Sequence, residues 1–237
     1  MVKIKLADIC VELENRYPDL EDFCRGYETE LPGMMRLRVT PEELEQERRS
    51  QSYDFSDGYL ETVCVYRKLA LELLRYGIFV LHASVLEVNG KGYGFLAPSG
   101  TGKTTQTRLW LDYFGDAARV INGDKPLIRM CSQGESWQFT AYGTPWNGKE
   151  RMGCNASVPL KALFLLERAE VPSCVRASEE DSIDRFFRQL LLPERTDQME
   201  ALLEMADRLI QTVPVYILRC NMTEESVKAA YEAVRKF

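Results

Sequence analysis

The sequence has few of the features that mark exported, membrane-bound or nucleic-acid-binding proteins. No run of residues is long and apolar enough to span a membrane, and the start of the chain lacks the apolar core of a signal peptide. The net charge is −6, whereas a nucleic-acid-binding protein is expected to be basic. We therefore expect a cytoplasmic protein that has neither a membrane nor a nucleic acid as its partner.

Histidine and paired cysteines are also scarce. His82 is the single histidine, and the 7 cysteines are scattered along the chain with no Cys-x-x-Cys pair. This composition argues against a zinc site and is typical of reduced thiols in a cytoplasm.

The most informative stretch that is present is Ala97-Pro98-Ser99-Gly100-Thr101-Gly102-Lys103-Thr104-Thr105. It lies between an apolar, strand-like run over 93–96 and a helix-like run over 105–113, which is the context of a phosphate-binding loop. The glycines let backbone N–H groups turn toward an anion, and the start of the helix adds positive charge. The strict pattern opens with Gly where this chain has Ala97. The alternative is a glycine-rich turn that binds nothing.

The spacing predicts a role for each residue of this loop. Lys103 would contact the β- and γ-phosphates of a nucleotide, and the hydroxyl of Thr104 would bind Mg²⁺. The predicted nucleotide-binding residues are Ser99, Gly100, Thr101, Gly102, Lys103, Thr104 and Thr105.

Hydrophobic patterning divides the chain into two sections. Residues 1–78 read as a small α+β section, with one strand over 2–12 and a helix that starts at Thr40, with Thr as N-cap and Pro next. Residues 79–237 read as an α/β core: a long strand over 79–88, an Asn-Gly hairpin turn and a returning strand over 91–97.

Two further residues could take part in chemistry near this loop. Asp124 follows a short strand after the loop's helix, so a parallel sheet would bring it beside Thr104 as a Mg²⁺ ligand; the alternative is an Asp that caps a turn. His82 lies in the middle of the predicted strand over 79–88. It would reach the phosphates only if the hairpin register brings it back to the loop, and it is otherwise a core or edge residue.

A second candidate is the polar segment 143–151, which contains an aromatic, an acid and two cations. Long loops on rigid scaffolds often have a function, and Lys149 or Arg151 would then neutralise phosphate charge. The alternative is a solvated surface connection.

Together these residues resemble a known family. The segments 81–85, 89–91, 95–104 and 120–124 are similar to the C-terminal domain of HPr kinase/phosphorylase, and most of all to the shorter HPr-kinase-like proteins of bacteria. The loop also resembles that of ATP-dependent phosphoenolpyruvate carboxykinase, which shares the core fold. The similarity covers residues 79–130 best, and residues 1–78 match neither family.

The resemblance implies a fold and a set of roles. The fold would be α/β, with a bent mixed β-sheet that contains a P-loop, flanking helices and the small α+β section in front. His82 would lie near the transferred phosphate, and Asp124 would act on the acceptor hydroxyl or the metal. The family usually shows two adjacent acids where this chain has Gly123-Asp124, so one carboxylate would do both tasks or one task is lost. The family's glycine-rich signature for phosphorylase activity has no clear copy here.

We therefore predict an ATP- and Mg²⁺-dependent kinase that transfers the γ-phosphate to a hydroxyl, on a Ser of a protein or peptide or on a small molecule. Its catalytic residues would be Asp124, His82 and Lys103, with Thr104 and Asp124 at the metal. Two alternatives stay open: a nucleotide-binding regulatory protein with weak catalysis, and a small-molecule enzyme of carboxykinase type. The sequence is also compatible with a homo-oligomer.

Overall fold

The computed structural model describes residues 1–134 and 136–235, apart from the side chain of Glu179. The chain forms two compact units, Met1–Tyr76 and Gly77–Phe237; the hydrophobic pattern of the sequence predicts the division after residue 78. None of the helices in these described residues has the length and apolar character needed to cross a bilayer.

The first unit is a three-stranded sheet, in the order β1-β2-β3, with α3 packed against β3 and with α1 and α2 packed against α3. Its first two strands form a hairpin, so the single strand predicted over 2–12 is wrong. Ala7 and Asp8 form the turn of this hairpin, with φ values of 45° and 65°. The turn contains no Gly or Asn, the residues that usually indicate a hairpin in a sequence. The predicted helix start is confirmed, because Thr40 caps α2 and Pro41 is its first residue. The elements are β1 (Val2–Leu6), β2 (Ile9–Glu14), α1 (Asp19–Phe23), β3 (Met35–Arg38), α2 (Pro41–Ser50), α3 (Asp57–Glu72) and η1 (Leu73–Tyr76).

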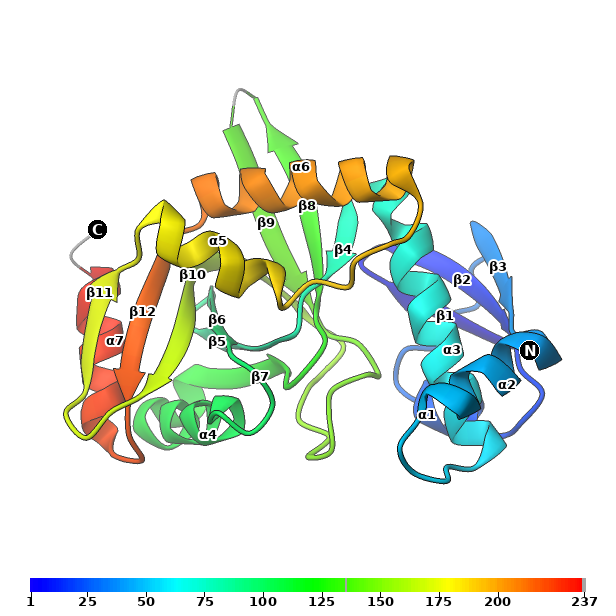
Figure 1. Ribbon diagram of the computed structural model, residues 1–237, viewed down its shortest axis with the longest axis horizontal. Coiled ribbons are helices and arrows are strands. Elements are labelled where there is room, and N and C mark those ends of the chain that lie inside the picture. Colours follow the sequence, from blue (N-terminus) through cyan, green and yellow to red (C-terminus); the bar gives the residue numbers. More distant parts are fainter. Residues whose placement is uncertain (135, 236–237) are drawn as a thin grey trace. The chain divides into compact units, whose positions relative to one another are not determined.

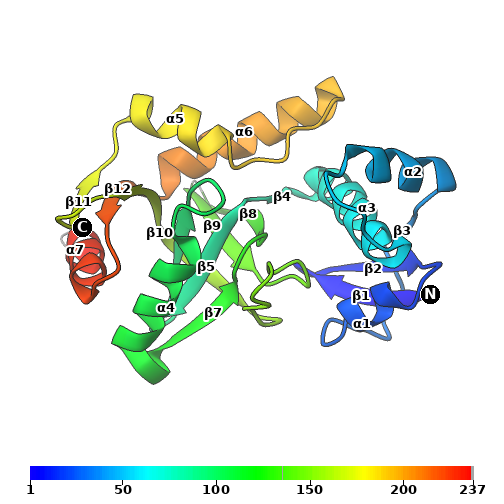
Figure 2. The ribbon, with the colours of Figure 1, turned by 60° about the horizontal axis from the view of Figure 1, so that its bottom comes forward.

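The second unit is built on a nine-stranded mixed sheet (Figures 1 and 2). Its main path runs β4-β8-β9-β10-β6-β5-β7, and β12 pairs with β10 and β11. The elements are β4 (Ile78–Val80), β5 (Ala83–Val88), β6 (Lys91–Leu96), α4 (Lys103–Phe114), η2 (Gly115–Ala117), β7 (Ala118–Asn122), β8 (Leu127–Gln133), β9 (Ser136–Tyr142), β10 (Ser157–Arg168), β11 (Ser173–Arg176), α5 (Glu179–Phe187), α6 (Thr196–Thr212), β12 (Val215–Cys220) and α7 (Glu224–Arg235).

The sheet curls because the long strand β10 belongs to both of its halves. Its first residues pair with β9 in an antiparallel ladder, and its later residues lie parallel to β6 on one side and to β12 on the other. The prediction of a mixed α/β fold with a bent sheet and flanking helices is therefore confirmed.

Helices cover both faces of this sheet (Figure 2). On one face, Trp110 of α4 is fully buried against Phe95 and Phe164 of the sheet, and side chains of α7 complete the same core cluster. Edge-on and tilted aromatic pairs of this kind add to the apolar burial. Across the sheet, α5 packs on β10 and α6 on β9. The aromatic cluster fixes α4 against β6, and so fixes the loop that joins them.

The predicted long strand over 79–88 is two strands in different halves of the sheet. Residues Ile78–Val80 pair with β8, whereas Ala83–Val88 pair with β6 and β7. His82 therefore lies at the junction between β4 and β5 and not in the middle of one strand. The hairpin turn is confirmed, with Asn89 at φ 49° and Gly90 at φ 75° between paired Val88 and Lys91.

Candidate functional site

The glycine-rich loop connects the end of β6 to the first residue of α4, as the sequence predicts. Gly100 and Gly102 have φ values of 78° and 131°, a region that side chains other than glycine rarely enter. The helix starts without a side-chain cap and without an acidic residue in its first turn. Its first N–H groups and the positive end of its dipole are thus available to an anion.

The β5–β6 hairpin brings His82 to this loop. Ala83 pairs with Leu96, so the preceding residue, His82, lies at the level of the loop's first residue, Ala97. The backbone N–H of His82 donates to the carbonyl of Gln189 at 2.8 Å. The ammonium of Lys103 donates to the carbonyl of Ala97 at 2.7 Å and lies 3.2 Å from Nε2 of His82.

Asp124 reaches the same place from β7. The backbone N–H of Ala83 donates to the carbonyl of Asp124 at 3.0 Å, which places the Asp124 side chain beside His82. Oδ1 of Asp124 is 3.2 Å from Nε2 of His82. The turn is capped by Asn122, whose Oδ1 accepts from the N–H groups of Asp124 and Lys125 at 2.9 and 2.7 Å. The Asp124 carboxylate is therefore not used for the turn and faces the histidine.

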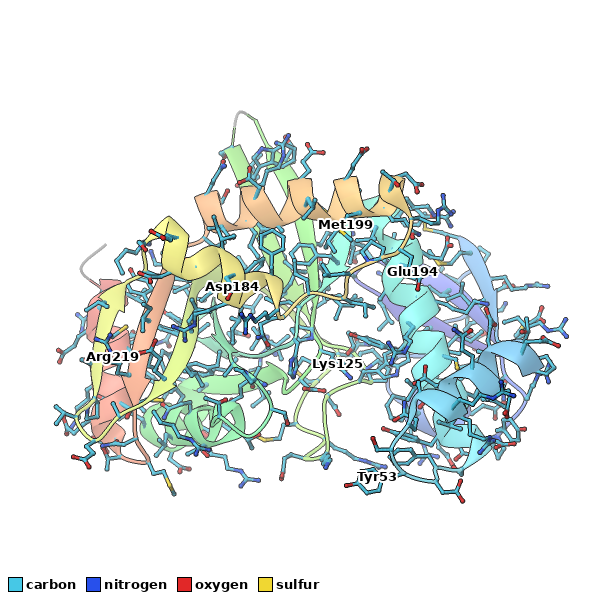
Figure 3. All side chains as sticks on the ribbon, in the orientation of Figure 1. Tyr53, Lys125, Asp184, Glu194, Met199 and Arg219 are labelled. Carbon is cyan, nitrogen blue, oxygen red and sulfur yellow. The ribbon has the colours of Figure 1, made fainter. Side chains whose placement is uncertain are left out.

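The electrostatics of these groups favour a charged carboxylate. Burial works to raise the pKa of Asp124, but the hydrogen bond with His82 and the charge of Lys125 outweigh it, so the pKa lies below its usual value. Lys125 is labelled in Figure 3, and its Nζ is 3.7 Å from Oδ2 of Asp124. Burial lowers the pKa of Lys103, and the nearby Asp124 carboxylate opposes that shift. About a third of the His82 side chain and a quarter of the Asp124 side chain remain exposed, at 33% and 26%, so solvent and ligands can reach both.

The sheet order differs from the one the sequence suggests for Asp124. β7 does not pair with β6, because β5 lies between them and is antiparallel to both. Strands β6 and β7 still run in the same direction, so their carboxyl ends meet at one edge of the sheet. There Asp124 approaches His82 and Lys103. The hydroxyls of Thr104 and Thr105 make no hydrogen bond within residues 1–134 and 136–235 and are half-buried.

The segment 143–153 packs onto the end of β7. The amide of Asn122, a fully buried residue, donates to Thr144. A Cβ atom at Gly123 would lie 3.0 Å from the carbonyl oxygens of both Asn147 and Met152, closer than ordinary packing allows. Position 123 therefore has no room for a second acidic side chain without movement of this segment.

The tip of the same segment is exposed beside the site. A Cβ atom at Gly148 would lie 3.0 Å from the Cβ of Asp124. The neighbouring Glu150 forms an ion pair with Arg108 of α4 at 2.6 Å, which links the tip to the loop's helix. Lys149 and Arg151 are exposed and form no ion pair with any residue the structure describes.

Four supporting residues are not among the site residues that the sequence predicts. Oγ of Ser84 and Oγ1 of Thr107 are 2.7 Å apart and buried, which ties α4 to β5. Asn122 shapes the turn of Asp124, as described above. Arg168, at the end of β10, donates to the carbonyls of Gly100 and Thr101. The Ser84–Thr107 contact, the bonds of Asn122 to Thr144 and the bonds of Arg168 join elements that are distant in the sequence, so only the strand pairing could reveal them.

The fold and the site define a class: a mixed α/β protein with a strand–glycine loop–helix unit and a Lys–His–Asp cluster beside it. Residues 58–229 match the family model of SynChlorMet cassette protein ScmC. The match spans well over half of the sequence, and the chain belongs to the ScmC family.

Among solved structures, the Hpr(Ser) kinase/phosphatase from Coxiella burnetii is similar at 11% sequence identity, over 66% of this chain and 88% of that chain, with a TM-score of 0.38. A TM-score this low does not establish a shared fold. No curated protein matches the sequence.

Proposed function

We propose that the protein binds ATP at the glycine-rich loop and transfers its γ-phosphate to a hydroxyl acceptor. The observation that supports this most is the convergence of His82, Lys103 and Asp124 at the loop, from three separate parts of the chain. A loop and a helix start alone would support only anion binding. A charged carboxylate beside a lysine and a histidine adds groups that can orient an acceptor and take its proton.

Phosphate binding would use the N–H groups of the loop and the ammonium of Lys103. In the structure this ammonium is bound to the carbonyl of Ala97 and lies beside His82. Lys103 would exchange these contacts for the β- and γ-phosphates, which offer a stronger, charge-assisted interaction. The same movement would release Nε2 of His82 to interact with Asp124 or with the γ-phosphate.

The residues present also fit a Mg²⁺ ion. This ion is usually held by one or two protein ligands together with substrate phosphates and waters. The free hydroxyl of Thr104 and the ionised carboxylate of Asp124 would hold it at the loop. When bound, it would neutralise charge on the phosphates. The described residues contain no cluster of three or more acidic, His or Cys side chains that could hold a metal without a nucleotide.

In the transfer step, the acceptor oxygen would attack the γ-phosphorus while the bond to the β–γ bridging oxygen breaks and ADP leaves. The hydroxyl proton would go to the carboxylate of Asp124, which would orient the acceptor. His82 would contact the transferred phosphoryl group or hold Asp124 in place. The acceptor is a serine of a protein or peptide, or a hydroxyl of a small molecule.

A catalytically weak nucleotide-binding protein is the second candidate, and one observation favours it. The HPr kinase pattern has two adjacent acids, but here the first position is Gly123. The segment 143–153 packs so closely on Gly123 that a larger side chain does not fit there without movement of the segment. A single carboxylate must then serve both the metal and the acceptor.

The binding half of the proposal is tested by calorimetric titration of Mg-ATP into the wild type and Lys103→Ala. The matched control is Lys91→Ala, an exposed lysine at the opposite end of β6 from the loop. We expect binding to the wild type and the control and a large loss for Lys103→Ala. Equal affinities in all three proteins would overturn the proposal. Transfer is then tested with radiolabelled ATP and serine-bearing acceptors; binding without any transfer would favour the second candidate.

A further inference from the structure

Arg168 holds the glycine-rich loop from a different strand. β10 lies parallel to β6, with Leu165 paired to Leu96, so the two strands end at the same edge of the sheet. Arg168 is the last residue of β10. Its guanidinium donates from Nη2 to the carbonyl of Gly100 at 2.5 Å and from Nε to the carbonyl of Thr101 at 3.3 Å. One planar group thus binds two consecutive carbonyls of the loop.

This contact determines where the loop's N–H groups point. A trans peptide is planar, so the C=O of one residue and the N–H of the next point in opposite directions. With the carbonyl of Thr101 held toward Arg168, the N–H of Gly102 points to the opposite side. The carbonyl of Gly100 is held in the same way, and the N–H of Thr101 donates to the carbonyl of Pro98 at 3.2 Å. A loop without this clamp would have two glycines free to rotate their peptides.

We infer that Arg168 is a positioning residue that presets the loop for the phosphates of a nucleotide. The inference rests on the proposed function, because it assigns a role in the binding of that same ligand. Arg168 acts through the loop's backbone and not as a direct phosphate ligand. The rigid fork of the guanidinium is what the two carbonyls require, and the single ammonium of a lysine cannot copy it.

The test compares four proteins: the wild type, Arg168→Ala, Arg168→Lys and the control Arg219→Ala. Arg219 lies on β12 (Figure 3), is paired in register with Glu167 and forms an exposed ion pair with that glutamate. Affinities are measured for Mg-ATP and for inorganic tripolyphosphate. We expect both Arg168 variants to bind each ligand about tenfold more weakly, and the control to change by less than about threefold.

Three binding results would overturn the inference. Wild-type affinity in Arg168→Lys would show that only the charge matters, and wild-type affinity in Arg168→Ala would show that the residue does not matter. A loss for ATP without a loss for tripolyphosphate would place the effect outside the phosphate loop and overturn it as well.

Amide hydrogen exchange in the ligand-free proteins separates this inference from the proposed function. The N–H of Thr101, bonded to Pro98, should exchange faster in both Arg168 variants than in the wild type and the control, with an unchanged melting temperature. If the wild type binds no nucleotide, the proposed function fails, and faster exchange at Thr101 would still support the clamp. Unchanged exchange in both variants would contradict the clamp whatever the ligand does.

Discussion

Nε2 of His82 lies 3.2 Å from Oδ1 of Asp124, and the same nitrogen lies 3.2 Å from Nζ of Lys103. A single ring nitrogen either accepts a hydrogen bond through its lone pair or donates one through its proton. It cannot serve both neighbours in one protonation state. In the ligand-free site, Lys103 and Asp124 therefore compete for a hydrogen bond with Nε2 of His82. A ligand that attracts the ammonium of Lys103 would leave this nitrogen to Asp124.

The first prediction concerns this nitrogen. Because His82 is the single histidine, its ring gives one set of imidazole signals in ¹⁵N NMR. Mg-ATP and Lys103→Met should move the Nε2 signal in the same direction, since both take the ammonium away from it. The control Lys91→Met should leave the signal in place. If Mg-ATP and Lys103→Met shifted the Nε2 signal in opposite directions, or if saturating Mg-ATP did not shift it, the release of His82 by Lys103 would be contradicted.

The second prediction is that Asp124 matters more for turnover than for binding. A carboxylate that orients the acceptor and takes its proton acts mainly in the transition state, so its loss lowers the rate. Asp124→Asn should slow phosphoryl transfer by about 10²- to 10⁴-fold with a much smaller change in the affinity for ATP. Both quantities are measured on the same preparation, by calorimetry and by consumption of ATP. ATP consumption at the wild-type rate would remove Asp124 from the mechanism.

The third prediction concerns the pH dependence of the first unit. Glu43 accepts hydrogen bonds from Lys68 at 2.7 Å and from the N–H of Thr40 at 2.8 Å. Burial works to raise its pKa, but these bonds outweigh it and the pKa is lowered in the folded state. A lowered pKa stabilises the fold above the unfolded value, and this contribution is lost as the pH falls through the folded value.

Glu43→Gln should therefore lower the melting temperature near neutral pH and lose that difference in acid, below the folded pKa of Glu43. Scanning calorimetry across this range measures it. The control is Glu45→Gln, on the same helix, whose partner Arg49 is largely exposed. A Glu43→Gln effect of the same size in acid and at neutral pH would show that the carboxylate's charge is not its cause.

The sequence predicts those parts of the site that depend on neighbours in the chain. The loop between β6 and α4, the hairpin turn at Asn89-Gly90 and the cap at Thr40 are each encoded within a few residues, and the structure has all three. The α/β class follows from the same local signals, whereas the bent mixed sheet is what the resemblance to the HPr kinase family implies. The break at His82 does not, because the run from 79 to 88 contains no Gly or Pro to mark it, and only pairing with β8 and with β6 divides the run.

The rest of the site depends on register between distant strands. Arg168 reaches the loop only because β10 lies parallel to β6, and Asn122 differs from any other turn residue only through its bonds to Thr144. No local pattern distinguishes these residues from other polar residues. The roles of Ser99, Thr105 and the other predicted ligands stay predictions until a ligand is bound.

The last prediction concerns the missing second acid. If Gly123 were a chance loss, Gly123→Asp would restore the paired acids of the HPr kinase pattern and raise activity. The structure predicts the opposite, because a Cβ there would press on the carbonyls of Asn147 and Met152. Overpacking of this kind typically costs about 1–3 kcal/mol.

Both Gly123→Ala and Gly123→Asp should therefore lower the free energy of unfolding, measured in urea, and neither should raise the rate of phosphoryl transfer. The control is Lys149→Ala, an exposed change in the same segment, which should leave stability unchanged. If Gly123→Asp transferred phosphate faster than the wild type and were equally stable, the segment 143–153 would have moved to admit the new side chain. The wild-type site would then lack a carboxylate that its reaction can use.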